Sequence, residues 1–375
     1  MKSVLSIQSH VVHGYVGGRA AIFPLQSQGW EVDNINTVHF SNHTGYGHFT
    51  GTSLACKELD SILDQLINNL DIEYSAVITG YIPNAKLIAC ISRYILQIKQ
   101  RNTPSEKPLY LFDPVMGDND YMYVDKSCVE EYRNLIKLRI ADIITPNQFE
   151  LQLLSGIKIS CRNSLKEALD KIHKEYGVPY IVVTSVDSKI VDGSESRNNS
   201  NSNSNSNSNS NKNIYCIISV KPQADKSQQE EEKGNETKLA MFQIPQIESY
   251  FTGVGDLFSA LLLDKFVANN HLENKPFQRL SRAVNQVLTI MKWTLKLTYE
   301  LGMDQARKAH CGEVKCNNTI SNGTSNGNGH IEDEEIVGKM NDANTMKHFE
   351  LKIIQARKYY GYDGEGEFKE MNVEF

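Results

Sequence analysis

The sequence lacks the features that would place it in a membrane, in a secretory route or on a nucleic acid. No stretch of its 375 residues approaches about 18 consecutive apolar residues, the length that a membrane-spanning helix needs. The N-terminal apolar run ends at Ile7, which is too short for a secretory signal. Lys and Arg number 39 against 45 Asp and Glu, and this net charge of −6 argues against a basic nucleic-acid-binding surface. We therefore expect no nucleic-acid partner and no membrane.

Cysteine patterns typical of a disulfide framework or a zinc site are also lacking. The seven cysteines are odd in number and widely spaced, and no C-x-x-C motif occurs. This usage favours a reducing compartment, so we expect a cytoplasmic protein and leave the nucleus open. Neither the pair His10 and His13 nor the group His310, Cys311 and Cys316 matches a tetrahedral zinc pattern.

Three segments have compositions that cannot build a packed core. Residues 193–211 are largely alternating Asn and Ser, residues 222–238 are rich in Gln, Glu and Lys, and residues 310–344 include the acidic run Glu332–Glu335. Such segments bury too little apolar surface to offset the entropy lost on ordering, so we predict disordered surface insertions. A strand is predicted at 214–220 between the first two. The rest of residues 1–375 is predicted to form a single domain, and an interaction role for the acidic run is a weaker alternative.

The remaining sequence alternates buried strands with amphipathic helices. Short apolar or β-branched runs predict strands at 4–7, 76–79, 109–112, 142–145 and 180–183. Apolar residues at helical spacing predict helices around 54–70, 87–98, 165–172 and 280–299. Strands that are apolar throughout and alternate with helices are typical of an α/β fold with a central parallel sheet.

Polar residues follow each of these strands. The segments are 8–10, 80–81, 113–118, 145–150 and 184–185, and they supply hydroxyl, amide, aromatic and carboxylate groups. Each could be a turn or a helix cap when taken alone. Because ligands of open α/β sheets bind beyond the carboxyl ends of the strands, five such endings on one edge predict a ligand site.

The segment Phe251–Leu263 carries the most specific signal. Two glycines, Gly253 and Gly255, allow close approach of a ligand, and a continuous apolar helix follows. The N-terminus of a buried helix offers free N–H groups and a positive dipole end, which suit a phosphate. Asp256 lies in the first turn, where it could compensate the helix dipole or accept a proton from a substrate hydroxyl.

Three carboxylates on the strand-following loops could serve Mg²⁺ and a nucleotide. Asp113, Asp118 and Glu150 are hard oxygen ligands, and Mg²⁺ commonly takes one or two carboxylates together with waters and phosphates. The set predicts a Mg·ATP site opposite the anion site of the glycine segment. No G-x-x-x-x-G-K-[ST] motif is present, and the catalytic-loop and D-F-G motifs of protein kinases are missing.

Taken together, these motifs resemble the pyridoxal kinase family of the ribokinase-like superfamily. The similar blocks are residues 5–11, 14–17, 40–46, 79–81, 113–118, 122–124, 142–150 and 253–256, with a weaker tail at 350–355. The resemblance implies a three-layer α/β/α fold with a mostly parallel central sheet. It also implies ATP-dependent phosphorylation of the 5′-hydroxyl of pyridoxal, pyridoxine or pyridoxamine, which gives pyridoxal 5′-phosphate from pyridoxal.

The resemblance also implies residue roles. Asp256 is implied as the general base, and the amides of Gly253, Val254, Gly255 and Asp256 as the anion hole. The vitamin ring is implied to contact Ser9, Val16, Phe40, His43, Thr44 and Tyr81, with Asp256 at its hydroxyl. ATP is implied to contact Asp118, Tyr123, Asn147, Glu150, Thr184, Ser185, Ile247, Glu248, Ser249, Gly253, Val254 and Gly255.

Metal ions and assembly follow from the same resemblance. It implies Mg²⁺ at Asp118 and Glu150, the latter through water, with Zn²⁺ as an open alternative. It implies a monovalent cation, K⁺, near Asp113, Thr145 and Thr184, and a homodimer.

Val254 stands where relatives often have Ala or Thr, and we expect it to face away from the site. A hydroxymethylpyrimidine kinase and a non-catalytic vitamin B6-binding protein remain alternatives.

Overall fold

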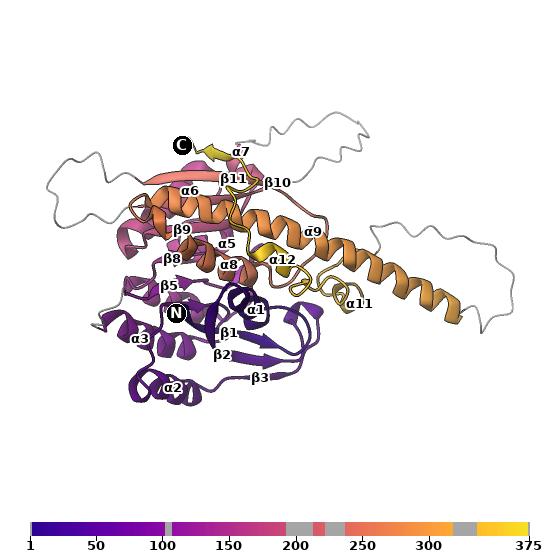
Figure 1. The fold of residues 1–375 in the computed structure, drawn as a ribbon, viewed down its shortest axis with the longest axis horizontal. Coiled ribbons are helices and arrows are strands. Elements are labelled where there is room, and N and C mark those ends of the chain that lie inside the picture. The colour runs from indigo at the N-terminus through magenta and orange to yellow at the C-terminus, as the bar shows by residue number, and fades with distance from the viewer. Residues whose placement is uncertain (1, 102–106, 193–212, 222–236, 318–335, 374–375) are drawn as a thin grey trace.

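The fold is described from a computed structural model that places residues 2–101, 107–192, 213–221, 237–317 and 336–373 (Figure 1). Its strands are β1 (Lys2–Val11), β2 (Trp30–Phe40), β3 (Gly51–Ser53), β4 (Ala76–Thr79), β5 (Leu109–Phe112), β6 (Gly117–Asp118), β7 (Tyr121–Met122), β8 (Ile143–Ile144), β9 (Tyr180–Asp187), β10 (Asn213–Val220), β11 (Lys238–Pro245) and β12 (Glu370–Asn372).

The helices alternate with these strands along the first half of the chain. They are α1 (Gly18–Ser27), α2 (Cys56–Asp64), α3 (Ala85–Gln100), α4 (Lys126–Lys137), α5 (Gln148–Ser155), α6 (Arg162–Tyr176), α7 (Ser188–Asp192), α8 (Val254–Ala268), α9 (Pro276–Asn317), α11 (Ala343–Met346) and α12 (Arg357–Tyr360). Short helical turns are η1 (Thr44–Tyr46), η2 (Gln65–Asn69) and η4 (Asn270–Leu272).

Ten strands form one sheet in the order β12-β11-β10-β9-β8-β5-β4-β1-β2-β3. The six central strands, from β9 to β2, all run parallel to their neighbours. The outer strands β3, β10, β11 and β12 pair antiparallel. All carboxyl ends of the central strands therefore meet at one edge of the sheet, where the sequence predicts the ligand site.

Helices cover both faces of the sheet, and alternate strand residues point to opposite layers. Leu5 and Val77 pack with α2 to α6, whereas Val4, Ala76 and Ile78 pack with α1, α8, α9 and α12. The predicted three-layer α/β/α fold with a mostly parallel central sheet is therefore confirmed.

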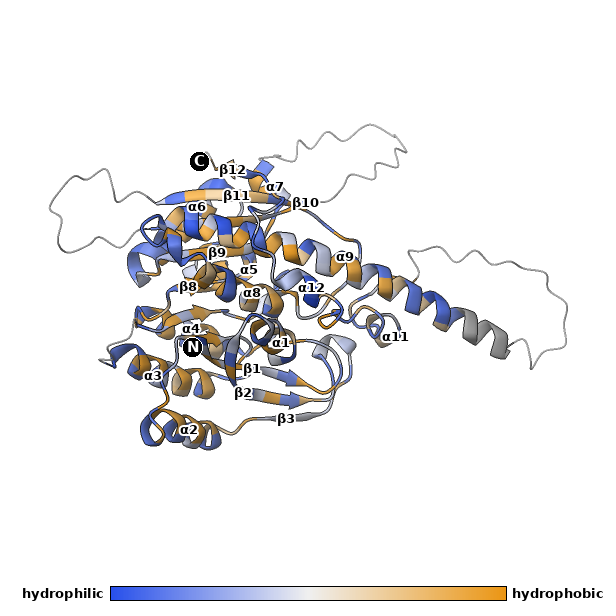
Figure 2. Cartoon of the chain, viewed as in Figure 1, coloured by the Kyte–Doolittle hydropathy of each residue, from blue (hydrophilic) through white to orange (hydrophobic). Residues whose placement is uncertain are grey.

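The helix α8 lies inside the molecule, and α9 lies partly outside it. Residues 257–266 of α8 are all buried, which agrees with the apolar run that the sequence shows up to Leu263 (Figure 2). The C-terminal part of α9 extends beyond the sheet and its helices (Figure 1), and residues 307–310 are exposed.

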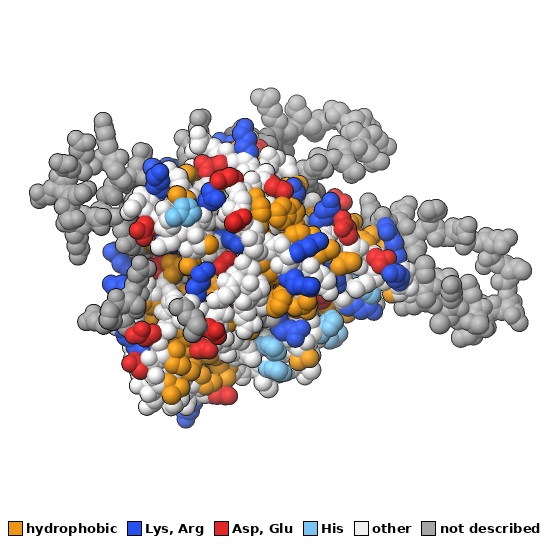
Figure 3. Space-filling view, in the orientation of Figure 1, with side chains coloured by type: hydrophobic (Ala, Val, Ile, Leu, Met, Phe, Trp, Pro, Cys, Tyr) orange, Lys and Arg blue, Asp and Glu red, His pale blue; other side chains and the backbone are white. Residues whose placement is uncertain are grey.

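On the face shown in Figure 3, basic and acidic side chains are interspersed. Within the described ranges, no helix has both the length and the apolar character needed to cross a membrane.

Several predicted boundaries were wrong. Thr184 and Ser185 do not follow a strand, because β9 continues to Asp187. The insertion predicted at 310–344 overlaps ordered chain at both ends, since α9 continues to Asn317 and Ile336 is buried. Lys238 belongs to β11 and not to an insertion. Most of the three predicted insertions, at 193–212, 222–236 and 318–335, lies outside the described residues, and this includes the acidic run.

Candidate active site

The loops at the carboxyl ends of the central strands are aligned by backbone hydrogen bonds. The amides of Gly80, Asp113 and Thr145 donate to carbonyl groups at the ends of the neighbouring strands, at 3.1, 3.0 and 3.2 Å. These bonds continue the parallel ladder past the last paired residues. The polar groups that follow β4, β5 and β8 therefore lie side by side, as predicted.

The N-terminus of α8 faces the loop that follows β1. Gly253, the residue before the helix, has a left-handed φ of 76°, and a Cβ atom there would collide with the carbonyl oxygen of Tyr15. Only glycine therefore allows this turn and this close approach together. The first amides of α8 have no partners within the helix, so they and the helix dipole can bind an anion.

Asp256 lies in the first turn of α8, and its side chain faces the Gly17 backbone N–H of the loop after β1. Burial raises the pKa of Asp256, and the Gly17 N–H opposes this rise. The carboxylate also borders Gly80, where a Cβ atom would lie 3.6 Å from the Asp256 Oδ1.

Asp113 is a buried carboxylate beside Asp256. The Ser259 hydroxyl donates to Asp113 Oδ2 at 2.9 Å and lies 3.0 Å from the Thr145 hydroxyl. Burial, and then the negative charge of Asp256, raise the pKa of Asp113 to about 7, whereas the hydroxyl groups lower it. The arrangement concentrates negative charge where a cation could bind. Ser259 was missed from the sequence, although its spacing of three residues from Asp256 places both on one helix face.

Glu150 is buried and makes hydrogen bonds to backbone amides of two loops. One of its oxygens accepts from the Asn147 N–H at 2.9 Å, and the other accepts from the amides of Met116 at 2.9 Å and Gly117 at 3.5 Å. Burial and the Asp113 charge raise the pKa of Glu150. Because backbone donors engage both oxygens, contact with a metal through water, as predicted, fits this geometry better than direct ligation.

Asp118 lies on the β6–β7 hairpin above this junction. The Asn147 amide donates to the Gly117 carbonyl at 2.7 Å and fixes the hairpin to the start of α5. The Asp118 carboxylate accepts only from the neighbouring Asn119 within the described residues, so it keeps the capacity to bind Mg²⁺. No group of three or more His, Cys, Asp and Glu in the described part of the chain could hold a metal ion unaided. Tyr123 follows the hairpin, and its side chain is exposed and packs beside Tyr121.

On the vitamin side, the structure places Ser9, Val16 and Tyr81 around the same edge. Ser9 ends the buried part of β1 and packs against Gly17, where a Cβ atom would collide with it. Val16 is buried in the loop that presents Gly17 to Asp256. Tyr81 directly follows Gly80 and is half-buried. These three predicted residues therefore lie near Asp256 along the chain segments that border it.

Phe40, His43 and Thr44 come from the end of β2 and from η1. Phe40 packs against Phe49 with ring centroids 4.8 Å apart. The Nδ1 of His43 accepts a hydrogen bond from the Gly45 N–H at 3.0 Å, and burial lowers its pKa to about 4. The histidine is therefore neutral at physiological pH. Thr44 is exposed.

The remaining residues predicted to contact the nucleotide make few side-chain interactions that link them to the site. Thr184 and Ser185 lie within β9 and are half-buried, and no hydrogen bond of the described residues joins the Thr184 side chain to Asp113. In the segment 247–249, Ile247 and Ser249 are half-buried and Glu248 is exposed, and the Ser249 hydroxyl accepts a hydrogen bond from Gly338. Val254 packs against the apolar layer of α8, as expected for a side chain that faces away from the site.

Two further buried groups border the site and were given no individual role from the sequence. Gln8 is 2% exposed, its Oε1 has no hydrogen-bond partner among the described residues, and a Cβ atom on Gly80 would lie 3.5 Å from it. Gln8 belongs to the polar segment 8–10, which the sequence predicts at the ligand site. Glu350 contacts the loop after β1 although 335 residues separate it from Tyr15, so nothing in local sequence could indicate this contact.

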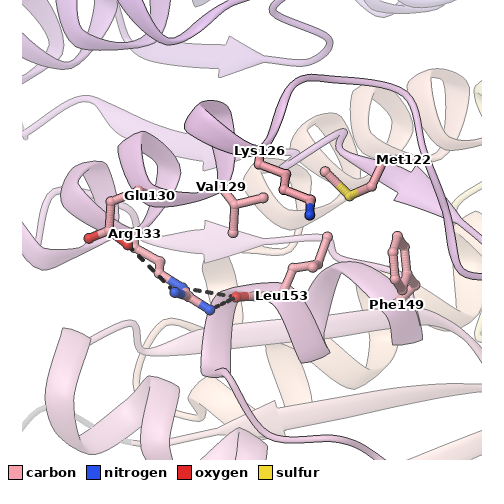
Figure 4. Close-up of a pocket in the computed structure, with 7 residues that line it drawn as sticks. All are labelled: Met122, Lys126, Val129, Glu130, Arg133, Phe149 and Leu153. Carbon is pink, nitrogen blue, oxygen red and sulfur yellow. Dashed lines mark hydrogen bonds and ion pairs between the residues drawn. The ribbon is translucent and has the colours of Figure 1, made fainter.

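A separate cavity of about 320 Å³ lies between α4, α5 and the β6–β7 hairpin (Figure 4). Met122, Val129, Phe149 and Leu153 give it an apolar lining. The Arg133 guanidinium, at one end of the view, is held by the Leu153 carbonyl at 2.6 Å. None of the predicted site residues lines this cavity, so it is distinct from the site at the strand ends.

Similarities to known proteins agree with this geometry. The model of the family described as phosphomethylpyrimidine kinase matches residues 35–213. A Saccharomyces cerevisiae protein provisionally named a pyridoxal kinase, BUD16, is 36% identical over 366 residues, which cover 96% of this chain and 95% of that protein. The pyridoxal kinase of Bos taurus is 38% identical over 264 residues, which cover 69% of this chain and 76% of that one.

Solved structures are similar over nearly the whole chain. A Leishmania donovani pyridoxal kinase in complex with ADP and pyridoxamine has a TM-score of 0.69 and 27% identity, and the match covers 96% of both chains. The same enzyme in complex with ADP has a TM-score of 0.71 and 26% identity, covering 100% of this chain and 99% of that one. These matches confirm the ribokinase-like fold that the sequence motifs imply.

Proposed function

Because this chain belongs to the pyridoxal kinase family, its reaction is the ATP-dependent phosphorylation of B6 vitamers, and we propose that Asp256 accepts the proton of the substrate hydroxyl. The observation that carries the role is the position of its carboxylate. It lies in the first turn of α8, beside the free amides that follow Gly253, and it faces the Gly17 N–H.

The geometry fits phosphoryl transfer, which depends on positioning and charge neutralisation more than on covalent catalysis. The amides of residues 253–256 would bind the transferring phosphoryl group at the N-terminus of α8. A primary alcohol is a weak acid, so Asp256 helps late, when the hydroxyl proton leaves. The raised pKa of Asp256 favours this role, because a more basic carboxylate accepts a proton more readily.

We place the vitamin ring between the loop after β1 and the segments 40–44 and 80–81. Ser9 and Thr44 supply hydroxyl groups for ring substituents, and Val16, Phe40, His43 and Tyr81 supply the packing surface. His43 is supported as a neutral hydrogen-bonding group, because burial lowers its pKa and its Nδ1 already accepts from Gly45.

We place the nucleotide along α5, the β6–β7 hairpin and β9. Asn147 and Glu150 are held in a reciprocal capping arrangement at the start of α5, and Tyr123 lies beside them. The proposed ATP contacts of Thr184, Ser185 and residues 247–249 rest on the family resemblance. Each can be tested separately by the effect of an alanine substitution on the KM for ATP.

The carboxylates fit two cations. Asp118, with Glu150 through water, would hold Mg²⁺, and Zn²⁺ remains an alternative. Mg²⁺ supplies neutralisation of the phosphate charge when it is bound. K⁺ would be held by Asp113 and the Thr145 hydroxyl, and the family resemblance adds Thr184. The Ser259 hydroxyl lies within hydrogen-bonding distance of both Asp113 and Thr145. We further propose a homodimer and a cytoplasmic location, with the nucleus left open.

Hydroxymethylpyrimidine phosphorylation is a second candidate, because the matching family model carries the name of a phosphomethylpyrimidine kinase. The curated relatives favour B6 vitamers over it. A non-catalytic vitamin-binding protein is disfavoured, since Asp256, both glycines and all three loop carboxylates are retained.

The substrate assignment can be tested with purified protein, ATP, Mg²⁺ and K⁺. Phosphorylation of pyridoxal, pyridoxine, pyridoxamine and hydroxymethylpyrimidine is compared by ADP release under identical conditions. We expect the highest kcat/KM with a B6 vitamer. A higher kcat/KM with hydroxymethylpyrimidine would overturn the assignment, and saturable pyridoxal binding without ADP release would favour the binding-protein alternative.

A further inference from the structure

A single buried carboxylate near the C-terminus joins three segments of the candidate site. Glu350 is 6% exposed. Its Oε2 accepts from the Tyr15 backbone N–H at 2.9 Å and from the Thr252 hydroxyl at 3.4 Å, and its Oε1 accepts from the Tyr46 hydroxyl at 2.7 Å. These donors belong to the loop after β1, the segment before α8, and η1.

Each of the three segments carries residues of the proposed chemistry. The loop at Tyr15 leads into Gly17, whose N–H faces Asp256. Thr252 directly precedes the glycine that turns the chain into α8. Tyr46 closes η1, the turn that begins after His43. Glu350 therefore lies at the junction of the vitamin-side loops and the anion-binding turn.

The position of Glu350 is fixed from the side away from the site. The neighbouring residues Phe349 and Leu351 are both buried, and Phe349 packs on Gly302 of α9 so closely that a Cβ atom there would collide with its ring. Gly14 makes the matching close approach on the site side, because a Cβ atom on it would collide with the Glu350 carboxylate. The carboxylate thus occupies a fitted space between α9 and the loop after β1.

The chain leading to Glu350 also connects the two substrate sides. The Tyr250 N–H donates to the Gly338 carbonyl at 2.8 Å, and the Asn341 N–H donates to the Gly45 carbonyl at 2.9 Å. The segment 336–350 therefore contacts both the chain before α8 and η1. In Figure 1 this segment, around α11, lies between α9 and the ends of β1 and β2.

The hydrogen-bonding pattern suits a carboxylate. All three partners donate to Glu350, and a carboxylate has acceptor capacity for all of them. A glutamine would present one acceptor oxygen and one NH₂ group, so the Tyr46 hydroxyl would have to turn from donor to acceptor, and the negative charge would be lost. Burial of the phenol, and then the negative charge of Glu350, raise the pKa of Tyr46. The Tyr46 hydroxyl is therefore kept protonated as a donor.

We propose that Glu350 is a positioning residue, which holds the loop after β1 and η1 against the anion-binding turn so that Asp256 meets the vitamin hydroxyl. The proposal rests on the proposed function and deepens it. It assigns a role in vitamin binding to a residue far from the ring-contacting segments in sequence.

The test compares Glu350→Gln and Tyr46→Phe with the wild type and with Glu367→Gln, which alters an exposed carboxylate near the same chain end. Turnover is measured with varied pyridoxal and with varied ATP, and pyridoxal affinity is measured without ATP by calorimetry. We expect kcat/KM for pyridoxal to fall about 10–100-fold in Glu350→Gln, since small misplacements of a reacting group have effects of this size. The KM for pyridoxal and its Kd should rise together, and the KM for ATP should stay within about three-fold.

Tyr46→Phe removes one hydroxyl group and is expected to fold normally, so it keeps the test decisive if Glu350→Gln is poorly stable. A smaller loss of the same kind, and a double variant with less than the product of the single effects, would support the proposal. Unchanged kinetics in both variants would overturn it, as would a lower active fraction with unaltered KM values. Lack of turnover in the wild type would instead refute the proposed reaction.

Discussion

The residue whose ionisation the site affects most clearly is Asp113. Its carboxylate is buried, and Asp256 repels its charge, so its pKa rises to about 7 from an ordinary 3.8. A raised carboxyl pKa means that the folded protein binds the proton more tightly than the unfolded chain does. Stability from this group is therefore present at low pH and is lost as the pH rises toward and through 7. A bound cation would relieve the same repulsion.

Asp113→Asn should consequently stabilise the protein free of nucleotide and K⁺ at pH 8. The rise in the Asp113 pKa corresponds to roughly 2–4 kcal/mol of stability that the wild type loses when this carboxyl group ionises. Asparagine has no ionisable group, so the variant avoids this loss. We expect the Tm of the variant to exceed that of the wild type at pH 8, with a smaller difference at pH 5, where Asp113 is protonated. The Tm of the variant and of the wild type is measured by thermal unfolding at pH 8 and at pH 5. An equal Tm difference at the two values would contradict it.

At the scale of elements, the turn into α8 is the feature on which the site depends most. Gly253 combines a left-handed φ of 76° with backbone packing against Tyr15, and both require the lack of a side chain. The sequence motif indicated this turn correctly, because two glycines before an apolar run have few structural uses. The motif did not show that the opposing wall is the loop after β1.

Gly253→Ala should therefore lower kcat, a loss that backbone strain alone does not produce. The added methyl group displaces the turn or the Tyr15 loop, and a shift of about 1 Å can lower kcat by about 10²-fold. The matched control is Gly29→Ala, where φ is 81° but no atom of the described residues, apart from the adjoining chain, lies within 4 Å of the new Cβ. That variant should lose only about 1–3 kcal/mol of stability to backbone strain and keep its kcat. Equal kcat values for the two variants would refute the importance of the close approach.

Strands and helices were predictable where burial determined their composition. The strands 76–79 and 109–112 were predicted with their observed bounds, because both faces are covered and both sets of side chains are apolar. The end of β9 was predicted wrongly, because Thr184 and Ser185 are polar and lie at an irregularity in the pairing of β9 with β10, beyond which the strand continues to Asp187. The extent of α9 past His310 was missed because its sequence there is polar, as suits a helix that extends beyond the packed body.

At the scale of the whole molecule, contacts between distant segments could not be predicted. The carboxylate set Asp113, Asp118 and Glu150 was identifiable because each residue follows a strand of the parallel core. Glu350 and Ser259 reach the site only through the packing of α8, α9 and the C-terminal segment. Local patterns carry no information on such docking, whereas the family resemblance supplied residue roles but no positions.

One buried histidine couples stability to pH across the molecule. His173 joins α6 to β10, with its Nδ1 at 2.6 Å from the Val178 carbonyl and its Nε2 at 2.7 Å from the Ser219 hydroxyl. Burial lowers the pKa of His173 to about 4 from 6.5. The folded state thus favours the neutral ring, and this contribution is complete above pH 6.5 and is lost as the pH falls toward 4.

His173→Gln should therefore flatten the pH dependence of the free energy of unfolding. The lowered pKa corresponds to about 2–3 kcal/mol of stability that the wild type loses between pH 7 and pH 4. Urea unfolding at pH 7 and at pH 4.5 compares the wild type, the variant and a control, His271→Gln, at an exposed position on η4. The prediction fails if both variants keep the slope of the wild type.

The most direct test of the account is the rate of ATP-dependent formation of pyridoxal 5′-phosphate, followed by absorbance with Mg²⁺ and K⁺ present. The wild type is measured beside Asp256→Asn and beside Asp304→Asn, which changes an exposed carboxylate on α9. The account predicts that kcat falls by about 10²–10⁴-fold in Asp256→Asn, with little change in either KM, and stays at the wild-type value in the control. Wild-type turnover in Asp256→Asn would contradict the role of the carboxylate. No turnover in the wild type, even with Zn²⁺ in place of Mg²⁺, would contradict the proposed reaction itself.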